Sequence, residues 1–496
     1  MSKKIFAALL ALIMCVGVLT SCSFLPFGKG DESENEGSKD VVESGNQDNS
    51  NSESESVEEG DGLGEYDFKG ATFTILSRKS TDYEHNGSLS GDSVSQQVYL
   101  RNQEVSKRFN VNINIYTLAG DWDQRDDFVT AIRAENMAPT GSYDLVSTHS
   151  VYLGWLGMEG VAHDLSTLPE VDLTRDWWNQ NSYKELNING KCYMMLGDIG
   201  HTIYEYISVM FVNTKLIENE NIIDGGMDAL YDMIEDGEWT WGELYEMSKD
   251  FGVGVETPTY GLLFNAHALR AALMSQDAYL YDRDENGKLY MELTADEHLV
   301  KSVENLSQFF ARSNMLYSAG WGTAWNELNP IFTADQALFY AQTLGEAANF
   351  QSMGSNYSVL PLPKYDEFQT DYYTICRDTV TGVMVMNCAK DLTMSGVVTQ
   401  ALCYYGAELV TPEYYEKVLK YRYNSDPRSI EMIDKVRDSL TIQPHATYYD
   451  TGIDFDMFSD IVKNGQTEGI ASKYAEFSQR GNSELQTFYD KIALLD

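Results

Sequence analysis

The fold is decided by a stretch that begins at Ala71-Thr72-Phe73-Thr74-Ile75-Leu76 and continues to residue 146. The opening run is β-branched and follows the turn Lys69-Gly70, which predicts a strand. Apolar residues at helical spacing then predict a helix over Val94–Phe109, and Val111–Ile115 alternates as a strand does. A second helix and a third strand complete the pattern, at 128–132 and 143–146. Strands and helices that alternate at this spacing predict a parallel α/β sheet.

In open sheets of this kind, ligands bind beyond the carboxyl ends of the strands. The residues at those ends are therefore the first candidates for ligand binding: Arg78, Asp121, Trp122, Thr148 and His149. No glycine-rich phosphate loop follows any of the three strands, so nucleotide phosphate is not an expected ligand.

The composition is strongly acidic, with 76 Asp and Glu against 35 Lys and Arg and a formal net charge of −41. This charge argues against functions that need a basic face, such as gripping nucleic acid or anionic lipid. Aromatic residues are 12% of the chain, enough to supply stacking surfaces for a sugar. Trp321 and Trp325 are candidates because the sequence around them has loop composition, although core packing is the alternative for any aromatic ring.

The N-terminus indicates secretion and lipid attachment. Lys3 and Lys4 precede an apolar run, and Leu19-Thr20-Ser21-Cys22 resembles the lipobox of bacterial lipoproteins. We interpret residues 1–22 as a signal peptide, with Cys22 acylated after cleavage, and residues 23–65 as a disordered acidic tether. The predicted location is the cell membrane, lipid-anchored at the extracellular face. An ordinary signal peptide followed by a chance cysteine is the alternative.

Five motifs occur in the order found in a known family: Tyr143–Val146 with Val161–Leu165, Asn189–Tyr193 with Ile207–Leu216, Trp239–Leu244, Phe332–Phe339, and Val359–Lys364. Over about residues 66–410 the chain thereby resembles the bacterial extracellular solute-binding proteins of family 1, which are similar to the maltose-binding protein. The chain departs from the pattern at Asp335, where the family has glycine, and at Met195-Leu196-Gly197, where a proline is missing.

The resemblance implies a two-lobed periplasmic-binding-protein-like α/β fold of type II. Each lobe would hold a mixed sheet flanked by helices, with a ligand cleft between the lobes and a helical C-terminal segment. The implied lobes are residues 66–175 with 360–408 and residues 176–359 with 409–496. Segment matching adds seven candidate ligand-binding residues: Glu205, Tyr206, Gln342, Glu346, Arg377, Asp378 and Tyr449.

The resemblance also implies a function: the substrate-binding component of an ABC importer. Such a protein would bind a carbohydrate, expected to be an oligosaccharide, and deliver it to a membrane permease, as a monomer without cofactor or catalysis. A surface glycoside-active enzyme is one alternative, because it needs only two carboxylates in a cleft. A binder of a non-sugar solute such as a polyamine and a surface glycan adhesin are the others. The sequence contains no HExxH or GxSxG motif.

Two further patterns concern metals and thiols. Asp282, Asp284 and Asn286 repeat the spacing that opens a calcium loop, but the twelfth position is Leu293, and a hairpin turning at Asn286-Gly287 is favoured. Beyond Cys22 the mature chain would hold four cysteines, namely Cys192, Cys376, Cys388 and Cys403. They allow three disulfide pairings, and buried free thiols are slightly favoured.

Overall fold

The computed structural model describes residues 60–312, 314–318, 324–353, 357–415, 417, 426–442 and 455–495. By its internal contacts the chain divides into residues 1–57 and 58–496, and all described residues lie in the second unit. The predicted signal peptide, Cys22 and the tether up to residue 59 lie outside the described residues. No helix within the described ranges is long and apolar enough to cross a membrane.

A first sheet has the strand order β12-β3-β1-β2. Its strands are β1 (Ala71–Arg78), β2 (Val111–Leu118), β3 (Leu145–His149) and β12 (Thr381–Val385). Strand β1 runs parallel to β2 and β3, whereas β12 returns antiparallel to β3 with Val383 opposite Ser147. The predicted parallel α/β core is thus confirmed. The strands run further than the sequence indicated, so that Arg78, Thr148 and His149 are the last residues of their strands and do not follow them.

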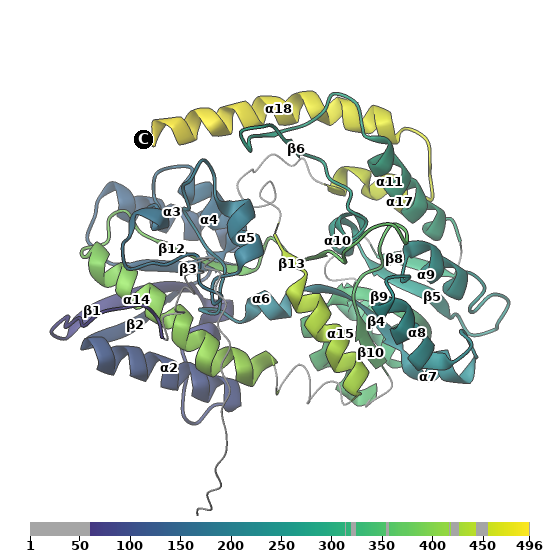
Figure 1. The fold of residues 1–496 in the computed structure, drawn as a ribbon, viewed down its shortest axis with the longest axis horizontal. Helices are drawn as coiled ribbons and strands as arrows, with labels where there is room; N and C mark the ends of the chain where they lie inside the picture. The colour runs from purple at the N-terminus through teal and green to yellow at the C-terminus, as the bar shows by residue number, and fades with distance from the viewer. Residues whose placement is uncertain are drawn as a thin grey trace, which may run out of the picture. The chain divides into compact units, whose positions relative to one another are not determined.

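Alternation along β1 directs its side chains to two different helical layers. Phe73 and Ile75 pack with α2 (Ser93–Phe109) and α14 (Leu392–Tyr405), and Leu76 packs with α3 (Arg125–Met137) and α4 (Ser150–Gly157). Figure 1 shows the two pairs of helices on opposite faces of the sheet. Helix α2 begins where the carboxylate of Asp92 accepts a hydrogen bond from Ser95 N, and it ends at Asn110, whose φ of 50° is left-handed.

A second, mixed sheet has the order β10-β4-β9-β5-β8. Its strands are β4 (Ser208–Asn213), β5 (Tyr260–Asn265), β8 (Met315–Ser318), β9 (Ala337–Thr343) and β10 (Tyr357–Leu360). Every residue of β4 and β9 is buried, which requires cover on both faces. Its helices are α7 (Thr214–Asn219), α8 (Gly226–Glu235), α9 (Trp241–Ser248), α10 (Ala268–Met274), α11 (Glu297–Phe310), α13 (Asn329–Thr333) and α15 (Pro427–Asp438).

The chain passes between the two sheets three times. The first passage contains α6 (Thr202–Glu205), the second contains β11 (Thr374–Ile375), and the third lies between α14 and α15. Residues of the first two passages meet in the bridge Ile207–Cys376, and β11 pairs with β13 (Leu440–Thr441), which follows α15. We call the elements around the first sheet the first lobe and those around the second sheet the second lobe.

The segment that includes α5 (Gln180–Leu186) packs with the first sheet, although the sequence assigned it to the second lobe. Trp178 is fully buried and donates to Gln400 Oε1 at 3.1 Å, and Met195 N donates to Val383 O at 3.0 Å. Cys192 belongs to the same hydrophobic cluster. We therefore place the first boundary between the lobes near residue 200 and not at residue 176.

The folded part also begins earlier than the predicted end of the tether at residue 65. Asp61 is buried and forms an ion pair with Arg108, whose Nη2 lies 3.0 Å from Asp61 Oδ1. Leu63 packs on the hydrophobic cluster of the first sheet. Order is therefore present from about residue 61.

Asp335 explains one departure from the family pattern. Its φ is 57°, a left-handed conformation that glycine adopts more easily, and its carboxylate accepts from Asn213 Nδ2 at 2.8 Å and pairs with Lys215. These contacts compensate for the strain of a non-glycine residue at this position.

The segment with calcium-loop spacing forms the predicted hairpin of β6 (Asp282–Arg283) and β7 (Leu289–Tyr290). Asp284 Oδ1 accepts from the backbone N–H groups of Asn286 and Lys288, at 2.8 and 2.9 Å. Within the described ranges, no cluster of three or more His, Cys, Asp or Glu side chains is arranged to hold a metal ion. Cys192, Cys376, Cys388 and Cys403 are free thiols.

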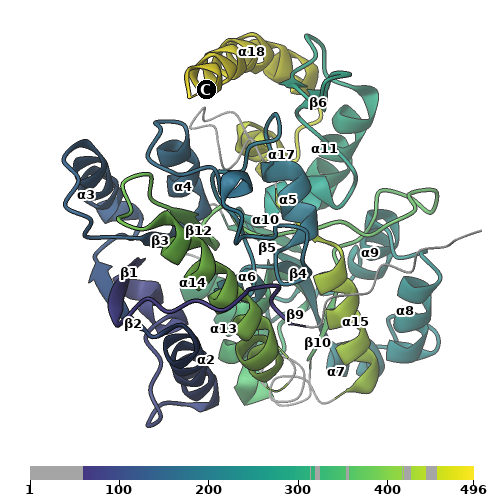
Figure 2. The same cartoon turned by 60° about the vertical axis from the view of Figure 1, so that its left-hand side comes forward.

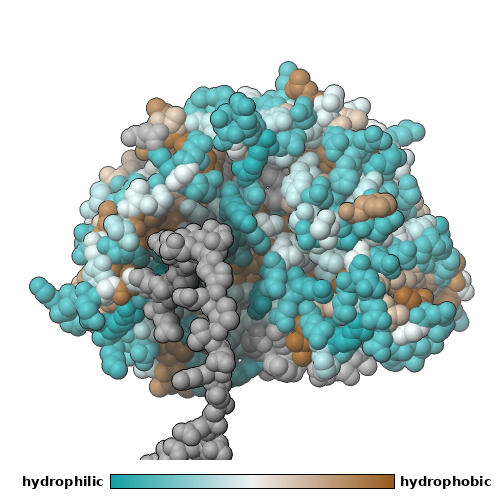
Figure 3. Space-filling model, viewed as in Figure 1, coloured by the Kyte–Doolittle hydropathy of each residue, from teal (hydrophilic) through white to brown (hydrophobic). Residues whose placement is uncertain are grey.

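The C-terminal segment is helical, with α17 (Ser459–Lys463) and the long α18 (Ile470–Leu494). Helix α18 lies along the hairpin, as Figures 1 and 2 both show. Leu289 N donates to Tyr489 OH at 2.7 Å, and the amide of Asn482 bonds to both backbone groups of Met291. The face of the molecule seen in Figure 3 is mostly hydrophilic, with hydrophobic residues scattered in small groups.

Short helical turns complete the described chain. They are η1 (Lys79–Glu84), η2 (Trp122–Gln124), η3 (Leu165–Thr167), η4 (Ala324–Leu328), η5 (Leu344–Met353), η6 (Gly406–Val410) and η8 (Phe455–Phe458).

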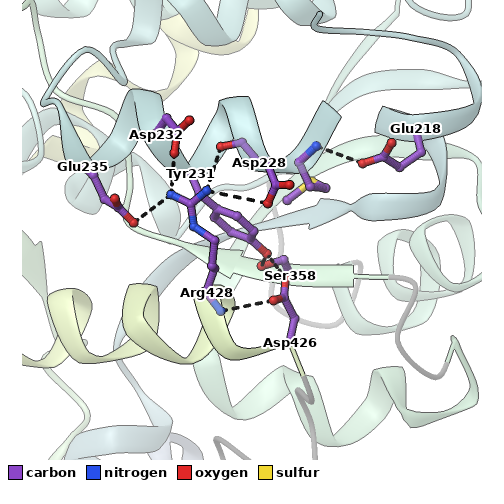
Figure 4. Close-up of polar contacts among 9 residues, drawn as sticks. Glu218, Asp228, Tyr231, Asp232, Glu235, Ser358, Asp426 and Arg428 are labelled. Carbon is purple, nitrogen blue, oxygen red and sulfur yellow. Dashed lines mark hydrogen bonds and ion pairs between the residues drawn. The ribbon is translucent and has the colours of Figure 1, made fainter. Parts of the chain in front are cut away.

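An acidic face of α8 anchors helix α15 to the second lobe (Figure 4). Arg428 Nη2 lies 2.7 Å from Asp232 and 2.9 Å from Glu235, and its guanidinium stands 5.1 Å above the ring of Tyr231. Tyr231 OH in turn donates to Ser358 Oγ of β10 at 2.8 Å. The chain that leaves the third passage is thereby fixed on the second lobe.

The packing of Trp178 gives a stability prediction. Trp178→Ala should lower the free energy of unfolding by about 3–5 kcal/mol, because it leaves a cavity and an unpaired Gln400 carbonyl in the first lobe. Urea unfolding followed by circular dichroism measures the loss. The matched control is Trp122→Ala, whose half-exposed ring should cost under about 1 kcal/mol. Equal losses for the two variants would contradict the assignment of Trp178 to the core of the first lobe.

Candidate functional site

The carboxyl edge of the first sheet holds a buried cation. Arg78 is 2% exposed, and the register of β1 against β3, with Ser77 opposite Ser147, sets it beside Thr148. Its Nη1 donates to Ser80 Oγ at 3.3 Å and to Asp121 Oδ1 at 3.5 Å. Its Nε and Nη2 are also buried, and neither has a hydrogen-bond partner among the described residues.

Next to this cation lies a cluster of aromatic rings. Trp122 is 50% exposed and stacks on Tyr152, with ring centroids 6.2 Å apart, and it lies 6.4 Å from Trp155. The guanidinium of Arg125 stands 4.9 Å from the indole centroid. The neighbours hold the ring in place while half of its surface stays open, which suits stacking on the apolar face of a sugar.

His149 is held as a neutral ring. Its Nδ1 donates to the carbonyl of Thr379 at 2.6 Å, and the ring meets Tyr152 edge-on at 4.8 Å. Burial and the nearby positive charge of Arg78 lower the pKa of His149 to about 3. In the same region, the hydroxyls of Thr148 and Tyr152 are buried, and the part of the chain that is described offers them no hydrogen-bond partner.

Glu205 ends α6, on the first passage between the lobes. Its Oε2 accepts a hydrogen bond from Tyr83 OH of the first lobe at 3.0 Å, and its Oε1 lies 3.9 Å from His201 Nε2. Burial, helped by the nearby carboxylate of Glu84, raises the pKa of Glu205 to about 7. Burial lowers the pKa of His201 to about 3, so this ring is neutral at pH 7 and does not compensate the charge of Glu205.

The second passage carries another guanidinium, which is half-buried. Arg377 N donates to Tyr206 O at 3.2 Å, and its Nη2 donates to Gln342 Oε1 at 3.0 Å. Burial lowers the pKa of Arg377. Gln342 lies within β9, and its Nε2 donates to Tyr340 OH at 3.0 Å.

Asp378 and Glu346 are the remaining acidic candidates. The carboxylate of Asp378 pairs with Arg270 Nη1 at 3.2 Å, and its carbonyl accepts from Ser150 Oγ at 2.7 Å. Glu346 Oε2 accepts from the amides of Asn329 and Asn349, at 2.8 and 2.7 Å. Both carboxylates are therefore held by neighbouring donors.

Eight of the predicted residues thus fall into two described groups, while Glu205, Glu346 and Asp378 have the separate partners given above. Arg78, Asp121, Trp122, Thr148 and His149 gather at the edge of the first sheet. Tyr206, Gln342 and Arg377 gather where the passages enter the second lobe. Trp321 and Tyr449 lie outside the described residues, and Trp325 belongs to η4 but its side chain is not described. The roles of these three residues stay predictions.

Sequence reasoning missed several residues of this region, above all Tyr152, Trp155, Tyr83 and His201. A usable signal existed for two of them, because Tyr152 and Trp155 are three residues apart in the helix that directly follows β3. That spacing puts both rings on one side of the helix, at the strand end where ligands bind. Tyr83 gave no such signal, since its partner Glu205 is far away in the sequence, whereas His201 lies only four residues before Glu205.

A cavity of about 800 Å³ lies elsewhere, between α5, α10, the hairpin, the second passage, the end of α15 and β13. Tyr279, Tyr372 and Tyr373 contribute to its wall, together with Lys184 and Lys435. None of the predicted ligand-binding residues lines it.

Two α/β lobes joined by three passages, with polar and aromatic side chains at the strand ends, define the two-lobed class of solute-binding proteins. The family model of the bacterial extracellular solute-binding proteins matches residues 97–391, which is more than half of the chain. The chain belongs to this family and is a solute-binding protein of the ABC-transporter type. No curated protein sequence matches it.

Three solved structures share the fold. The GacH receptor of Streptomyces glaucescens, solved unliganded and with acarbose, is 12% identical, with a TM-score of 0.53, 85% of this chain covered and 99% of that one. A cyclo/maltodextrin-binding protein with maltotetraose is 15% identical, with a TM-score of 0.55 and coverage of 86% and 98%. An ABC substrate-binding protein of Listeria monocytogenes with cycloalternan is 12% identical, with a TM-score of 0.50 and the same coverage. The family and these neighbours are binding proteins and not enzymes.

The raised pKa of Glu205 predicts a pH-dependent stability. A carboxyl group whose pKa is about 4.5 when unfolded and about 7 when folded stabilises the protein below pH 4.5 and loses that contribution as the pH rises through 7. Between pH 4.5 and 8 the wild-type protein should lose up to about 3 kcal/mol of unfolding free energy relative to Glu205→Gln. Urea titrations of both proteins across this range measure the difference, and parallel pH profiles would contradict the prediction.

Proposed function

We propose that the protein is the extracellular, lipid-anchored solute-binding component of an ABC importer. It binds a carbohydrate, in our proposal an oligosaccharide, in a cleft between the two lobes and delivers it to a membrane permease. Cys22 holds the lipid, and residues 23–60 form the tether. The protein acts as a monomer, without cofactor and without catalysis.

The observation that carries the carbohydrate class is the arrangement around Trp122. A half-exposed indole, fixed by Tyr152 and Trp155, lies beside Arg78 and the buried hydroxyls of Thr148 and Tyr152. A sugar ring offers an apolar face for stacking and hydroxyls for hydrogen bonds, and this surface is complementary to both. The oligosaccharides named for the three structural neighbours support the same class.

The passages between the lobes suit a protein whose two lobes close when a solute is bound. Tyr83 of the first lobe bonds to Glu205, and Arg377 links the second passage to Gln342 of the second lobe. A solute held by both groups of residues would favour the closed arrangement over the open one, and that shift in population is the signal to a permease.

A cationic solute such as a polyamine fits the same surface poorly. Arg78 is a buried cation and Arg377 is a half-buried one, and both would face the positive charges of the ligand. A glycoside-active enzyme could have the same fold, but it would cleave the saccharide that it binds. An experiment that looks for cleavage distinguishes it from a binding protein.

Binding to oligosaccharides tests the proposal. Isothermal titration of the purified protein with a panel of neutral and acidic oligosaccharides and polyamines should show binding of a saccharide, and chromatography should recover that saccharide uncut after prolonged incubation.

Trp122→Ala should weaken the binding of that saccharide by about tenfold or more, because a stacked aromatic contact contributes roughly 0.5–1.5 kcal/mol beyond its buried area. The matched control is Phe368→Ala, at a ring that is 83% exposed. Recovery of cleaved sugar would support the glycoside-active enzyme instead. Binding of polyamines alone would contradict the proposal that the solute is a carbohydrate.

The lipid anchor is tested separately. In a bacterium with lipoprotein processing, the wild-type chain should fractionate with membranes and carry an acyl group at Cys22 by mass spectrometry, whereas Cys22→Ser should not be acylated there. The anchor prediction fails if the two proteins fractionate alike.

A further inference from the structure

The two nitrogens of Arg78 that have no partner belong to one edge of its guanidinium. Nε–H and one N–H of Nη2 point in the same direction, as a pair of parallel donors, and this edge matches the two oxygens of a carboxylate. Nη1, on the other side of the group, is occupied by Ser80 and Asp121. The Nε and Nη2 groups of Arg78 therefore form a preformed bidentate hydrogen-bond donor.

Other arginines of the same chain show what this edge normally binds. In Arg133 the same two nitrogens, Nε and Nη2, bond to the two carboxylate oxygens of Glu159, each at 2.6 Å. Arg101 is fully buried, yet each of its nitrogens has an acceptor: Asn102 Oδ1 at 3.1 Å, Ile199 O at 2.8 Å and Glu84 O at 2.9 Å. Arg78 is equally buried, but its carboxylate-binding edge has no acceptor among the residues that the structure describes.

An arrangement of this kind is costly for folding. A buried donor without a partner destabilises the folded protein by about 1–3 kcal/mol, and more when the group is charged. Asp121, at 3.5 Å and with a 60% exposed side chain, compensates little of that cost. The hydroxyls of Thr148 and Tyr152 add two more buried polar groups that lack a partner within the described ranges. Such a set is explained by an acceptor that arrives with the ligand.

We propose that the solute carries a carboxylate and that Arg78 binds it through Nε and Nη2, so that the substrate class is an acidic oligosaccharide containing a uronic acid. The inference rests on the proposed function, since it names the substrate of the same site. The uronate ring stacks on Trp122, and its hydroxyls are received by Thr148 and Tyr152. The edge of Arg78 is covered in the described arrangement, so the side chains that cover it have to move before the solute reaches it.

A carboxylate fits better than a phosphate or sulfate group on two grounds. It is planar with two oxygens, as the open edge requires, whereas a tetrahedral anion presents further oxygens that need donors of their own. A phosphate monoester also carries up to two negative charges on one group, and a chain with a net charge of −41 repels such a dianion more strongly than a single carboxylate.

The test uses matched ligands. Isothermal titration compares oligogalacturonates and other oligouronates with their fully methyl-esterified counterparts, which keep the rings and lose the charge. At least one acid should bind about 30-fold or more tightly than its ester, because a buried charge-assisted pair contributes at least that factor. Arg78→Gln should remove this preference, so that the variant binds acid and ester with equal affinity. Arg133→Gln, which breaks the exposed pair with Glu159, is the control and should bind the acid like the wild type.

A second measurement separates ligand binding from a structural role. Without ligand, Arg78→Gln should unfold at the same urea concentration as the wild type or at a higher one, because it removes a buried charge that has no full partner. A variant that unfolds earlier would indicate a structural arginine and would overturn the inference.

The outcomes also distinguish this inference from the function on which it rests. If the acid and the ester bind equally and Arg78→Gln has no effect, the inference of a bound carboxylate is wrong. The proposed carbohydrate-binding function is then unaffected. Tight binding of a sulfated or phosphorylated sugar but no uronate would do the same. If no saccharide of either kind binds, the proposed function fails and the inference fails with it.

Discussion

The antiparallel pairing of β12 with β3 is the constraint on which the rest of the structure depends. It joins Thr381 to His149 across the whole second lobe, so a long loop must close before the first sheet is complete. Once formed, it sets the carbonyls of Asp378, Thr379 and Val380 against Val151 N, His149 Nδ1 and Ser150 N. The edge of the first sheet and the second passage are thereby built as one piece, with Arg78 and Trp122 on one side and Arg377 on the other.

Local patterns predicted much of the first lobe. The β-branched run at β1, the apolar spacing of α2 and the alternation of β2 each reflect burial on a known face, and that burial is encoded within a few residues. The hairpin of β6 and β7 was predicted for the same reason, because Asn286-Gly287 supplies the turn without help from the rest of the chain. Strand ends were predicted two or three residues short, since pairing with a neighbour extends a strand beyond its own pattern.

Non-local partners account for what the sequence did not reveal. Trp178 belongs to the first lobe because of Gln400, and Met195 because of Val383, and neither relation leaves a trace near residue 176. The ionisation of Glu205 depends on burial and on Tyr83 and Glu84, which both belong to η1, far from Glu205 in the sequence. That Arg78 lies at a strand end was readable from the sequence, but the open edge of its guanidinium became visible only once its neighbours were placed.

The three passages between the sheets have a consequence for how such a protein can change over evolutionary time. The first lobe is assembled from residues before the second lobe and from residues after most of it, and α15 returns to the second lobe through Arg428. Neither lobe is a contiguous piece of chain. A gene rearrangement that moves one uninterrupted segment therefore cannot transplant a whole lobe. In this architecture a whole lobe can therefore be changed only by substitutions in separate segments of the chain.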